Sequence, residues 1–464
     1  MTPMNWSTAE ITNALGDQLV SVQMCDQSDS MVANIETDSR KAGEGHVFVC
    51  LRGDRFDAHD FAADVAQKGV LGIVSEKKLA LDVPHWVVKD TRKALGLLGR
   101  AWREKFNGPV MAVVGSNGKT TSKEMLASVA RVHWGPQPVC VTQGNLNNEI
   151  GVPLTLFQLR STHAAAVIEM GMNHPGEIAY LASLVRPDAV LLTNAQREHQ
   201  EFMKSVLAVA EENGSAFEFI RQGGVAVYPA ESEFNSVWAR LAGTARQVSF
   251  GEAGQVSVSQ TTEQAEVQLP GSKHTFRPSF VGQHNFDNAG GVAALAFAMG
   301  IPGDTIATGL AGFQAVNGRL KVVCNSSRLF LIDDSYNANP DSVNAAAQVL
   351  SGLPGASILV LGDMGEVGDQ SEQVHQEVGS TAKSLGIDAM YCVGEASQHS
   401  AAAFGEGALY FERLEDLITQ LSQTVNNKKY NVLVKGSRFM KMERVVDALM
   451  QVHSSTDQGD QHAA

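Results

Sequence analysis

A chain of 464 residues exceeds what one hydrophobic core accommodates, and its length predicts about three domains. The net charge of −14 argues against a general nucleic-acid surface, because such surfaces gather positive charge to neutralise phosphates. No apolar stretch approaches the ~20 residues of a membrane span, and residues 1–6 lack the regions of a signal peptide, so we expect a cytoplasmic protein without membrane insertion.

Five cysteines are scattered through the chain, at positions 25, 50, 140, 324 and 392. Their spacing matches neither a disulfide framework nor a zinc motif. We therefore expect reduced thiols buried in the domain cores.

The first domain is predicted to span residues 1–106 and to be a small α/β unit. Apolar runs predict strands at 46–51, 71–74 and 86–88. A helical pattern over 91–106 is then broken by residues 107–109, which are Asn-Gly-Pro. This break is a good domain boundary.

Two polar clusters in this domain are candidates for ligand binding. They place hydroxyls and guanidinium groups beside turns and contain Thr37, Ser39, Arg40, Arg52 and Arg55. Such groups suit a phosphorylated or polyhydroxy ligand. A pair of solvated loops explains the spacing equally well, so both interpretations stay open at this point.

The stretch 110–121 is the one around which the rest of the chain is organised. An apolar run ends at a glycine loop with the sequence Gly115, Ser116, Asn117, Gly118, Lys119, Thr120 and Thr121. The glycines let backbone N–H groups converge on an anion, Lys119 can reach terminal phosphate oxygens, and Thr120 can bind Mg²⁺ at a helix start.

This loop is shorter than the usual G-x-x-x-x-G-K-[ST]. Gly115 stands three residues before Gly118, and the position five before Gly118 is Val113. A glycine-rich turn with a solvated lysine is the competing interpretation.

A dense run of side-chain amides follows in residues 142–155, which include Asn145, Asn147 and Asn148. Such a run predicts a loop that binds a ligand. An Asn-rich turn network that satisfies its own backbone is the alternative.

Two further apolar strands are expected at 164–168 and 189–192, and polar side chains follow both. Glu169 comes directly after the first strand, and His199 comes shortly after the second. Ligands of open parallel sheets bind beyond the carboxyl ends of the strands. We therefore expect Glu169 and His199 to meet whatever Lys119 holds, where a carboxylate and an imidazole can bind a divalent metal. A structural role is the alternative for a lone histidine.

The second domain is predicted to span 107–315. Short alternating segments at 243–278 predict a small antiparallel excursion without a chemical motif. Asn288 lies in the helix that follows and can offer its amide to a base edge, with ordinary helix capping as the alternative.

The third domain, predicted to span 316–464, repeats the pattern of strands that end in polar residues. Its strands are expected at 329–332, 358–361 and 431–434. No G-x-G-x-x-G occurs, so a dinucleotide fingerprint is absent. Arg319, at the junction, can reach a triphosphate. Two α/β domains facing each other across strand ends suggest a closing cleft, with phosphoryl transfer by positioning and charge neutralisation.

These motifs resemble those of the Mur ligases, the ATP-dependent peptide-bond-forming enzymes of peptidoglycan precursor synthesis, from the first domain to the last. The family's phosphate loop is shortened in the same way. The matching residues are 115–121, 169–171, His199, His284, Asn288, Gly318, Arg319 and Asp334. The resemblance implies an α/β, three-domain architecture with a central P-loop-type parallel sheet and a Rossmann-like C-terminal domain.

Within the family, the pattern is most similar to the members that add D-alanyl-D-alanine to UDP-N-acetylmuramoyl-tripeptide. Residues 336–340, Tyr-Asn-Ala-Asn-Pro, stand where the members that add the third amino acid usually carry D-Y-A-H-T-P. The implied reaction uses ATP to convert the tripeptide carboxylate into an acyl phosphate, which the dipeptide amine attacks. ATP and Mg²⁺ are the implied cofactors, and a monomer is expected.

The resemblance also implies roles for individual residues. The implied catalytic residues are Lys119, Glu169, His199, Arg319 and Asp334. The implied metal ligands are Thr120, Glu169 and His199. ATP is expected to contact Gly115, Ser116, Asn117, Gly118, Lys119, Thr120, Thr121, Arg319 and, at the adenine, Asn288. The substrates are expected to contact Thr37, Ser39, Arg40, Arg52, Arg55, Asn145, Asn147, Asn148, Tyr336, Asn337, Asn339, Lys435 and Arg438.

One departure from the family concerns the second metal. Many members carry a lysine shortly after the metal-binding histidine, whose carbamate helps to hold that metal, and this chain has Asn213 there. Either Glu211 or Glu212 takes over the charge, or the second metal is weaker. Residues 194–199 are also unusual.

Other functions remain to be weighed. A sibling that adds the third amino acid is one, and a P-loop ATPase or nucleotide switch is another, although it leaves the polar strand ends of the third domain without a role. Folate polyglutamate ligases resemble this chain only from the phosphate loop onward. A non-enzymatic UDP-sugar binding protein needs neither Lys119 nor Glu169.

Overall fold

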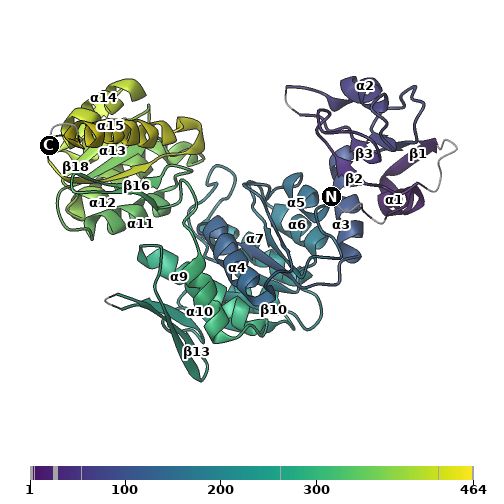
Figure 1. Cartoon of the computed structure of the whole chain (residues 1–464), viewed down its shortest axis with the longest axis horizontal. Coiled ribbons are helices and arrows are strands. Elements are labelled where there is room, and N and C mark those ends of the chain that lie inside the picture. The colour runs from purple at the N-terminus through teal and green to yellow at the C-terminus, as the bar shows by residue number, and fades with distance from the viewer. Residues whose placement is uncertain are drawn as a thin grey trace.

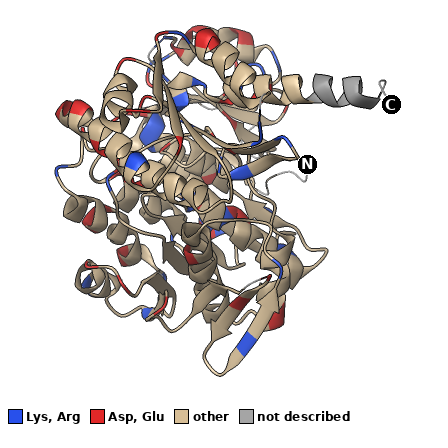
Figure 2. Ribbon diagram, turned by 90° about the vertical axis from the view of Figure 1, so that its left-hand side faces the viewer, with Lys and Arg blue, Asp and Glu red and all other residues tan. Residues whose placement is uncertain are grey.

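The computed structural model describes residues 4, 6–23, 30–53, 55–261, 263–426 and 428–461, with side chains up to residue 453. The described strands form four sheets. In Figure 1 the central part of the chain lies between an N-terminal part at the upper right and a C-terminal part at the upper left. Figure 2 shows Lys and Arg interspersed with Asp and Glu along the described ribbon. None of the described helices is long and apolar enough to span a bilayer.

The N-terminal sheet has five strands in the order β1-β5-β4-β3-β2, antiparallel between β1 and β5 and parallel elsewhere. Its strands are β1 (Leu19–Gln23), β2 (Asn34–Glu36), β3 (His46–Val49), β4 (Gly72–Ser75) and β5 (His85–Val88), and its helices are α1 (Thr8–Leu15), α2 (Ala62–Ala66) and α3 (Thr91–Glu104). The predicted strands and helix of this region are confirmed, with small differences at their ends.

The central sheet has six parallel strands in the order β11-β10-β9-β6-β8-β7. Its strands are β6 (Val110–Val114), β7 (Val139–Val141), β8 (Ala165–Glu169), β9 (Ala189–Leu192), β10 (Val225–Pro229) and β11 (Arg246–Phe250). Its helices are α4 (Lys119–Trp134), α5 (Gly151–Leu156), α6 (Glu177–Val185), α7 (Val206–Gly214), α8 (Asn235–Ala242), α9 (Gln283–Ala298) and α10 (Gly303–Gly312). Because β7 and β8 lie on one side of β6 and the later strands on the other, the crevice of this sheet opens at the carboxyl end of β6.

A small antiparallel sheet projects from the central part, at the lower left in Figure 1. It consists of β12 (Ser257–Gln260), β13 (Ala265–Leu269) and β14 (Ser272–Phe276), which confirms the predicted excursion. The prediction was wrong for residues 247–250, which belong to β11 and pair in parallel with β10. A short alternating segment does not reveal whether its partner is parallel or antiparallel.

The C-terminal sheet has six strands in the order β15-β16-β20-β17-β18-β19, antiparallel only between β15 and β16. Its strands are β15 (Lys321–Asn325), β16 (Leu329–Asp334), β17 (Ser357–Gly362), β18 (Ala389–Val393), β19 (Ala408–Phe411) and β20 (Tyr430–Lys435). Its helices are α11 (Pro340–Ser351), α12 (Ser371–Ser384), α13 (Ser397–Phe404), α14 (Leu414–Val425) and α15 (Glu443–Gln461). The three strands predicted here are confirmed by β16, β17 and β20.

The side chains of β6 alternate between the two faces of the central sheet. Ala112 and Val114 join a core that continues through α3 to Trp86 in the N-terminal sheet. Met111 and Val113 join a second core, with α4, α9 and α10. The N-terminal and central parts therefore share apolar packing.

The C-terminal sheet has two cores of its own, one on each face. Polar pairs such as Asn117 with Asn339 and Arg197 with Asp341 join it to the central part. Interfaces of this polar kind permit relative motion of domains. The predicted domain limits at 106/107 and 315/316 fall between the sheets and stay predictions.

Four cysteines, Cys50, Cys140, Cys324 and Cys392, are buried free thiols. Burial raises the pKa of the Cys50 and Cys140 thiols to about 12, so both stay protonated. The expectation of reduced core thiols is confirmed for these four, and Cys25 lies outside the described residues.

Candidate active site between the central and C-terminal sheets

The phosphate loop follows β6 directly and depends on two glycines. Gly115 has φ +129° and Gly118 has φ +83°, a region that side-chain-bearing residues rarely adopt. A Cβ atom on Gly115 would lie 2.1 Å from Thr193 Oγ1, and one on Gly118 would lie 2.2 Å from Asn288 Oδ1. The loop is therefore packed between the end of β9 and α9.

Replacing Gly118 by alanine is expected to destabilise the protein and weaken ATP binding. The left-handed backbone costs roughly 1–2 kcal/mol with a side chain, and the new methyl group also displaces Asn288. Gly176→Ala is the matched control, because Gly176 precedes α6 in the same left-handed conformation, at φ +89°, with open space around its Cβ position. Thermal unfolding and calorimetric titration with ATP measure both effects. Equal losses in the two variants would contradict the packing role of Gly118.

Lys119 begins α4 and folds back over the loop. Its Nζ donates to the carbonyl of Gly115 and to that of Ser116 at 2.9 Å, and lies 3.3 Å from Glu198 Oε2. The Glu198 side chain is only 6% exposed, so this is an inward-facing ion pair. Lys119 can exchange these contacts for phosphate oxygens by a rotation of its side chain.

Glu169 reaches the loop because β8 and β6 pair in parallel, with Glu169 opposite Val113. Its Oε1 accepts hydrogen bonds from Thr120 Oγ1 at 3.2 Å and from Asn147 Nδ2 at 2.8 Å. Its Oε2 is buried and has no hydrogen-bond partner among the described residues. A buried carboxylate oxygen that accepts no hydrogen bond from the described residues is a suitable ligand for a hard divalent cation such as Mg²⁺.

His199 lies in the loop after β9 with φ +49°. Its Nδ1 is 2.6 Å from Oε2 of Glu366, which follows β17 in the C-terminal part. The close approach of the His199 ring lowers the pKa of the Glu366 carboxyl. His199 and Glu169 line the same cavity, but among the described residues no three His, Cys, Asp or Glu side chains form a metal cluster. A cation here needs further ligands, such as phosphate oxygens.

Asn213, at the position of the family's lysine, is buried and supports the phosphate loop. Its Oδ1 accepts from Gly115 N at 2.9 Å, and its Nδ2 lies 3.4 Å from Glu198 Oε1. Glu212 is committed elsewhere, because its carboxylate caps α6 through the N–H groups of Gly176 and Ile178. Glu211 is exposed and lines neither of the cavities described below.

The strand ends of the C-terminal sheet bring Asp334 and Lys435 together, since they are register partners on β16 and β20. Lys435 Nζ is 2.7 Å from Asp334 Oδ2 and also donates to the carbonyl of Asn337 at 2.9 Å. Asp334 Oδ1 accepts from Leu320 N at 3.0 Å. Both charged groups are buried, so the pair orders the segment that leads from Arg319 into this sheet.

Arg319 lies over the ring of Tyr336, with its guanidinium carbon 4.1 Å from the ring centroid. Arg438 lies near the same ring at 5.9 Å. Cation–π contacts of this kind hold a guanidinium in place without consuming its N–H donors. Arg319 therefore keeps its donors for an anion.

Asn339 links the C-terminal part to the phosphate loop. Its Oδ1 caps α11 by accepting from Ser342 N at 2.8 Å, and its Nδ2 donates to Asn117 Oδ1 at 2.9 Å. Pro340 at the first helical position strengthens this helix start. Asn339 is therefore held by Ser342 of the C-terminal part and by Asn117 of the central part.

Arg197 links the two parts through both its guanidinium group and its backbone N–H. Its guanidinium contacts Asp341 Oδ1 at 3.0 and 2.6 Å and both carboxylate oxygens of Glu377 at 2.8 Å, while its backbone N–H donates to Asp341 Oδ2. The hydrogen bonds from Arg197 lower the pKa of the Glu377 carboxyl. This ion-pair group, which we call the Arg197 clamp, joins the loop after β9 to α11 and α12.

Two cavities meet at the phosphate loop. The larger has a volume of about 1010 Å³ and the smaller about 340 Å³. The residues that line both are Asn117, Gly118, Thr121, Arg319, Ser342 and Lys435. This is the arrangement that transfer of a group from one ligand to another requires.

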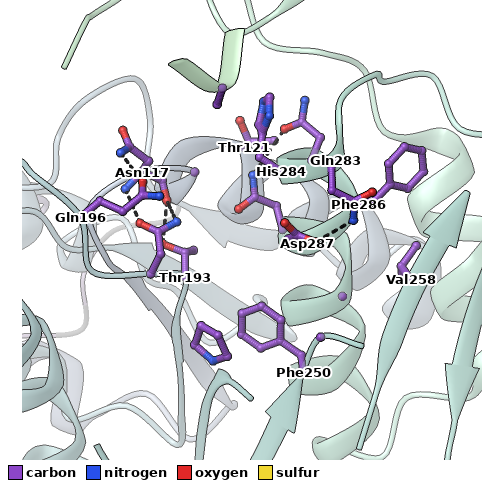
Figure 3. A pocket seen from close by; sticks show the side chains of 18 of the residues that line it. Asn117, Thr121, Thr193, Gln196, Phe250, Val258, Gln283, His284, Phe286 and Asp287 are labelled. Carbon is purple, nitrogen blue, oxygen red and sulfur yellow. Dashed lines mark hydrogen bonds between the residues drawn. The ribbon is translucent and has the colours of Figure 1, made fainter. Parts of the chain in front are cut away.

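The larger cavity has a polar end and an apolar wall (Figure 3). In this view Asn117, Thr193 and Gln196 lie together at the left, Phe250 lies at the lower centre and Val258 lies at the right. Asn288, the residue predicted to contact adenine, lines this cavity as well. The segment 243–278 was expected to contain no chemical motif, but its residues 250–252 and 257–260 line this cavity.

The smaller cavity gathers most of the residues predicted to bind the reacting ends of the substrates. It is lined by Asn145, Asn147, Asn148, Glu169, His199, Tyr336, Asn337 and Asn339.

Burial in the larger cavity lowers the pKa of His284, so its imidazole is neutral near pH 7.

The N-terminal candidates Thr37, Ser39, Arg40, Arg52 and Arg55 line neither cavity. Arg40 is exposed and pairs with Asp38, whose pKa it lowers. Arg52 lies near the central part, since its carbonyl accepts from Arg92 at 3.1 Å, and Arg92 also pairs with Glu149. All five residues lie in the N-terminal part of the chain, outside both cavities, and their role in binding stays a prediction.

Comparison with known proteins agrees with this geometry. Residues 113–296 match the Mur ligase middle domain, and residues 318–438 match the Mur ligase, glutamate ligase domain. The UDP-N-acetylmuramoyl-tripeptide–D-alanyl-D-alanine ligase of Escherichia coli K12 is 38% identical over 91% of this chain and 95% of its own length. The chain belongs to the Mur ligase family.

Solved structures of Mur ligases match more than nine tenths of this chain. A crystal structure of MurF from Acinetobacter baumannii matches with a TM-score of 0.89 and 34% identity, over 97% of this chain and all of the other. A MurF ligase of Thermotoga maritima, solved in complex with ADP, matches with a TM-score of 0.83 and 26% identity, over 91% of this chain and 98% of the other. The predicted α/β Mur ligase architecture is confirmed.

Several residues of this Mur ligase site were missed by sequence reasoning. Glu198, Arg197, Glu366 and Phe250 all line the cavities. The only signal for the first two was the unusual composition of residues 194–199. No sequence signal marked Phe250, because an aromatic residue at the end of a strand can pack in the core or line a ligand cavity.

Proposed function

We propose that this Mur ligase joins D-alanyl-D-alanine to UDP-N-acetylmuramoyl-tripeptide in an ATP-dependent reaction of peptidoglycan synthesis. The observation that carries the proposal is the phosphate loop between two cavities, a larger one for a nucleotide and a smaller one lined by amides. The choice of substrates is supported by the relatives of that name, which match between 89% and 96% of this chain. ATP as the nucleotide is supported by the ADP complex of the Thermotoga maritima enzyme.

In the first step, a carboxylate oxygen of the tripeptide attacks the γ-phosphorus of ATP, and ADP leaves. In the second, the dipeptide amine attacks the acyl carbon and loses a proton, and phosphate departs with the oxygen that came from the carboxylate. The nucleotide binds in the larger cavity, with its base against Phe250 and near Asn288 and its phosphates on residues 115–121. Lys119 and Arg319 neutralise charge that grows on the transferring phosphoryl group.

Mg²⁺, when bound, supplies further neutralisation of phosphate charge. Thr120, Glu169 and His199 would hold it, and the free Oε2 of Glu169 supports this assignment. Asp334 orders the segment that carries Arg319, because its Oδ1 accepts a hydrogen bond from Leu320 N while its Oδ2 pairs with Lys435. These roles are proposals for this chain's own residues.

The reacting carboxylate of the tripeptide binds in the smaller cavity. The dipeptide binds in the same cavity. Asn145, Asn147 and Asn148 face it from the central part, and Tyr336, Asn337 and Asn339 face it from the C-terminal part. Lys435 and Arg438 support the second group by their contacts with Asn337 and Tyr336. The UDP-sugar end binds at Thr37, Ser39, Arg40, Arg52 and Arg55.

We further propose a cytoplasmic monomer that binds no nucleic acid. The proposed substrates and ATP are compounds of the cytoplasm, and one chain supplies every group named in the site. The net charge of −14 and the interspersed charges of Figure 2 do not suit a polyanion surface.

The test is phosphate release from ATP and Mg²⁺ with UDP-N-acetylmuramoyl-tripeptide present and D-alanyl-D-alanine added or withheld, followed by mass spectrometry of the nucleotide product. The proposal predicts release that needs both substrates and a UDP-linked pentapeptide. Release that needs neither would replace the ligase by an ATPase. Product with a single amino acid instead of the dipeptide would indicate the sibling reaction.

A further inference from the structure

Glu198 is a buried charge whose partner must leave during the proposed reaction. Its side chain is 6% exposed, and its cationic contact is Lys119 Nζ at 3.3 Å. Asn213 Nδ2, at 3.4 Å from the other carboxylate oxygen, is neutral. If Lys119 turns to a triphosphate, Glu198 keeps one amide contact and loses its counter-charge, which is costly in a buried position.

The surroundings of Glu198 indicate what replaces the lysine. His199 Nε2 lies 4.0 Å from Glu198 Oε2, and Glu169, with its free Oε2, lines the same cavity. Two carboxylates and an imidazole that line one cavity suit a divalent cation, which would take further ligands because these side chains do not form a metal cluster by themselves among the described residues. The two glutamates considered from the sequence are unsuitable, because Glu212 caps α6 and Glu211 is exposed.

We infer that Glu198 exchanges partners during the reaction: it pairs with Lys119 until the triphosphate takes that lysine, and then serves as counter-charge to a divalent cation beside His199. The inference rests on the proposed function, because it needs a nucleotide at the phosphate loop. It explains why Asn213 can be neutral: Asn213 holds Gly115 and Glu198 in place, and Glu198 supplies the negative charge.

The test measures metal binding without turnover. Mn²⁺ replaces Mg²⁺, its free concentration is followed by electron paramagnetic resonance, and a non-hydrolysable β,γ-methylene analogue of ATP occupies the full-length protein. Glu198→Gln is expected to weaken Mn²⁺ binding to this complex about 10- to 100-fold. Glu211→Gln, the same change at an exposed carboxylate of α7, is expected to leave it unchanged. Wild-type Mn²⁺ affinity in Glu198→Gln would overturn the inference.

A second variant keeps the inference falsifiable if Glu198→Gln folds poorly. Lys119→Met removes the competing cation, so Mn²⁺ is expected to bind more tightly than to the wild type when no nucleotide is present. The double variant with Glu198→Gln should lose this gain. A gain that persists in the double variant, or no gain at all, would show that Glu198 has only a structural role. Pentapeptide formation by the wild type tests the proposed function separately, so the two can fail independently.

Discussion

Lys119→Ala is expected to lower kcat by about 10²- to 10³-fold, because it removes a preorganised cation from the charge that develops on the transferring phosphoryl group. The side chain is already aimed at the loop, where Nζ contacts the carbonyls of Gly115 and Ser116. The loss should fall on kcat more than on the KM for D-alanyl-D-alanine, because the contacts of the Lys119 side chain within the described part of the chain are with Gly115, Ser116 and Glu198. Steady-state kinetics with each substrate varied in turn measures it.

Lys204→Ala is the control for this experiment. Lys204 is exposed, lies close in sequence to His199, the histidine proposed to bind metal, and lines neither cavity. Wild-type activity is expected for it. A Lys119→Ala protein with kcat near that of the wild type would show that the loop binds no reacting phosphate.

Arg197→Ala is expected to release the C-terminal part from the central part. The variant loses the whole Arg197 clamp and leaves Asp341 and Glu377 facing each other without a cation. Hydrogen bonds to charged groups are worth about 1.5–3 kcal/mol, so we expect kcat/KM to fall at least about tenfold. Arg319 and Tyr336, which belong to the C-terminal part, would lose their position over the phosphate loop.

The structural readout for Arg197→Ala is small-angle X-ray scattering, which should show a larger radius of gyration than the wild type. High salt should also increase the radius of gyration of the wild type, because salt screens the partly exposed ion pairs of Arg197. Arg277→Ala, an exposed arginine of the central part, should change neither quantity. Unchanged scattering together with unchanged kcat/KM would mean that the clamp does not hold the two parts together.

Features set by local sequence were predictable. The apolar strands, the glycine loop and the helix start at Lys119 follow from short-range patterns, and parallel pairing then brings Glu169 to the carboxyl end of β6 beside the loop. Many of the residues around the smaller cavity could be named for the same reason, because they are polar groups at the end of a buried strand or in the loop that follows. Arg197, Glu198 and Glu366 line the same cavity and were missed.

Contacts between distant segments were not predictable from these patterns. Arg197 and Asp341 are far apart in the sequence, and nothing near either residue indicates the other. The same holds for Asn213, which lies on α7 and supports Gly115 across the sheet. The wall formed by Phe250 and Val258 depends on how the small antiparallel sheet packs on α9, which periodicity does not specify.

The central claim, activation of the tripeptide carboxylate by ATP, is tested most directly by isotope transfer. UDP-N-acetylmuramoyl-tripeptide labelled with ¹⁸O in its terminal carboxylate is incubated with ATP, Mg²⁺ and D-alanyl-D-alanine, and the released phosphate is analysed by mass spectrometry. The proposed mechanism predicts one ¹⁸O atom in each phosphate formed, because the oxygen that attacks the γ-phosphorus leaves with it. Phosphate free of ¹⁸O would mean that water attacks ATP, and would contradict the acyl phosphate.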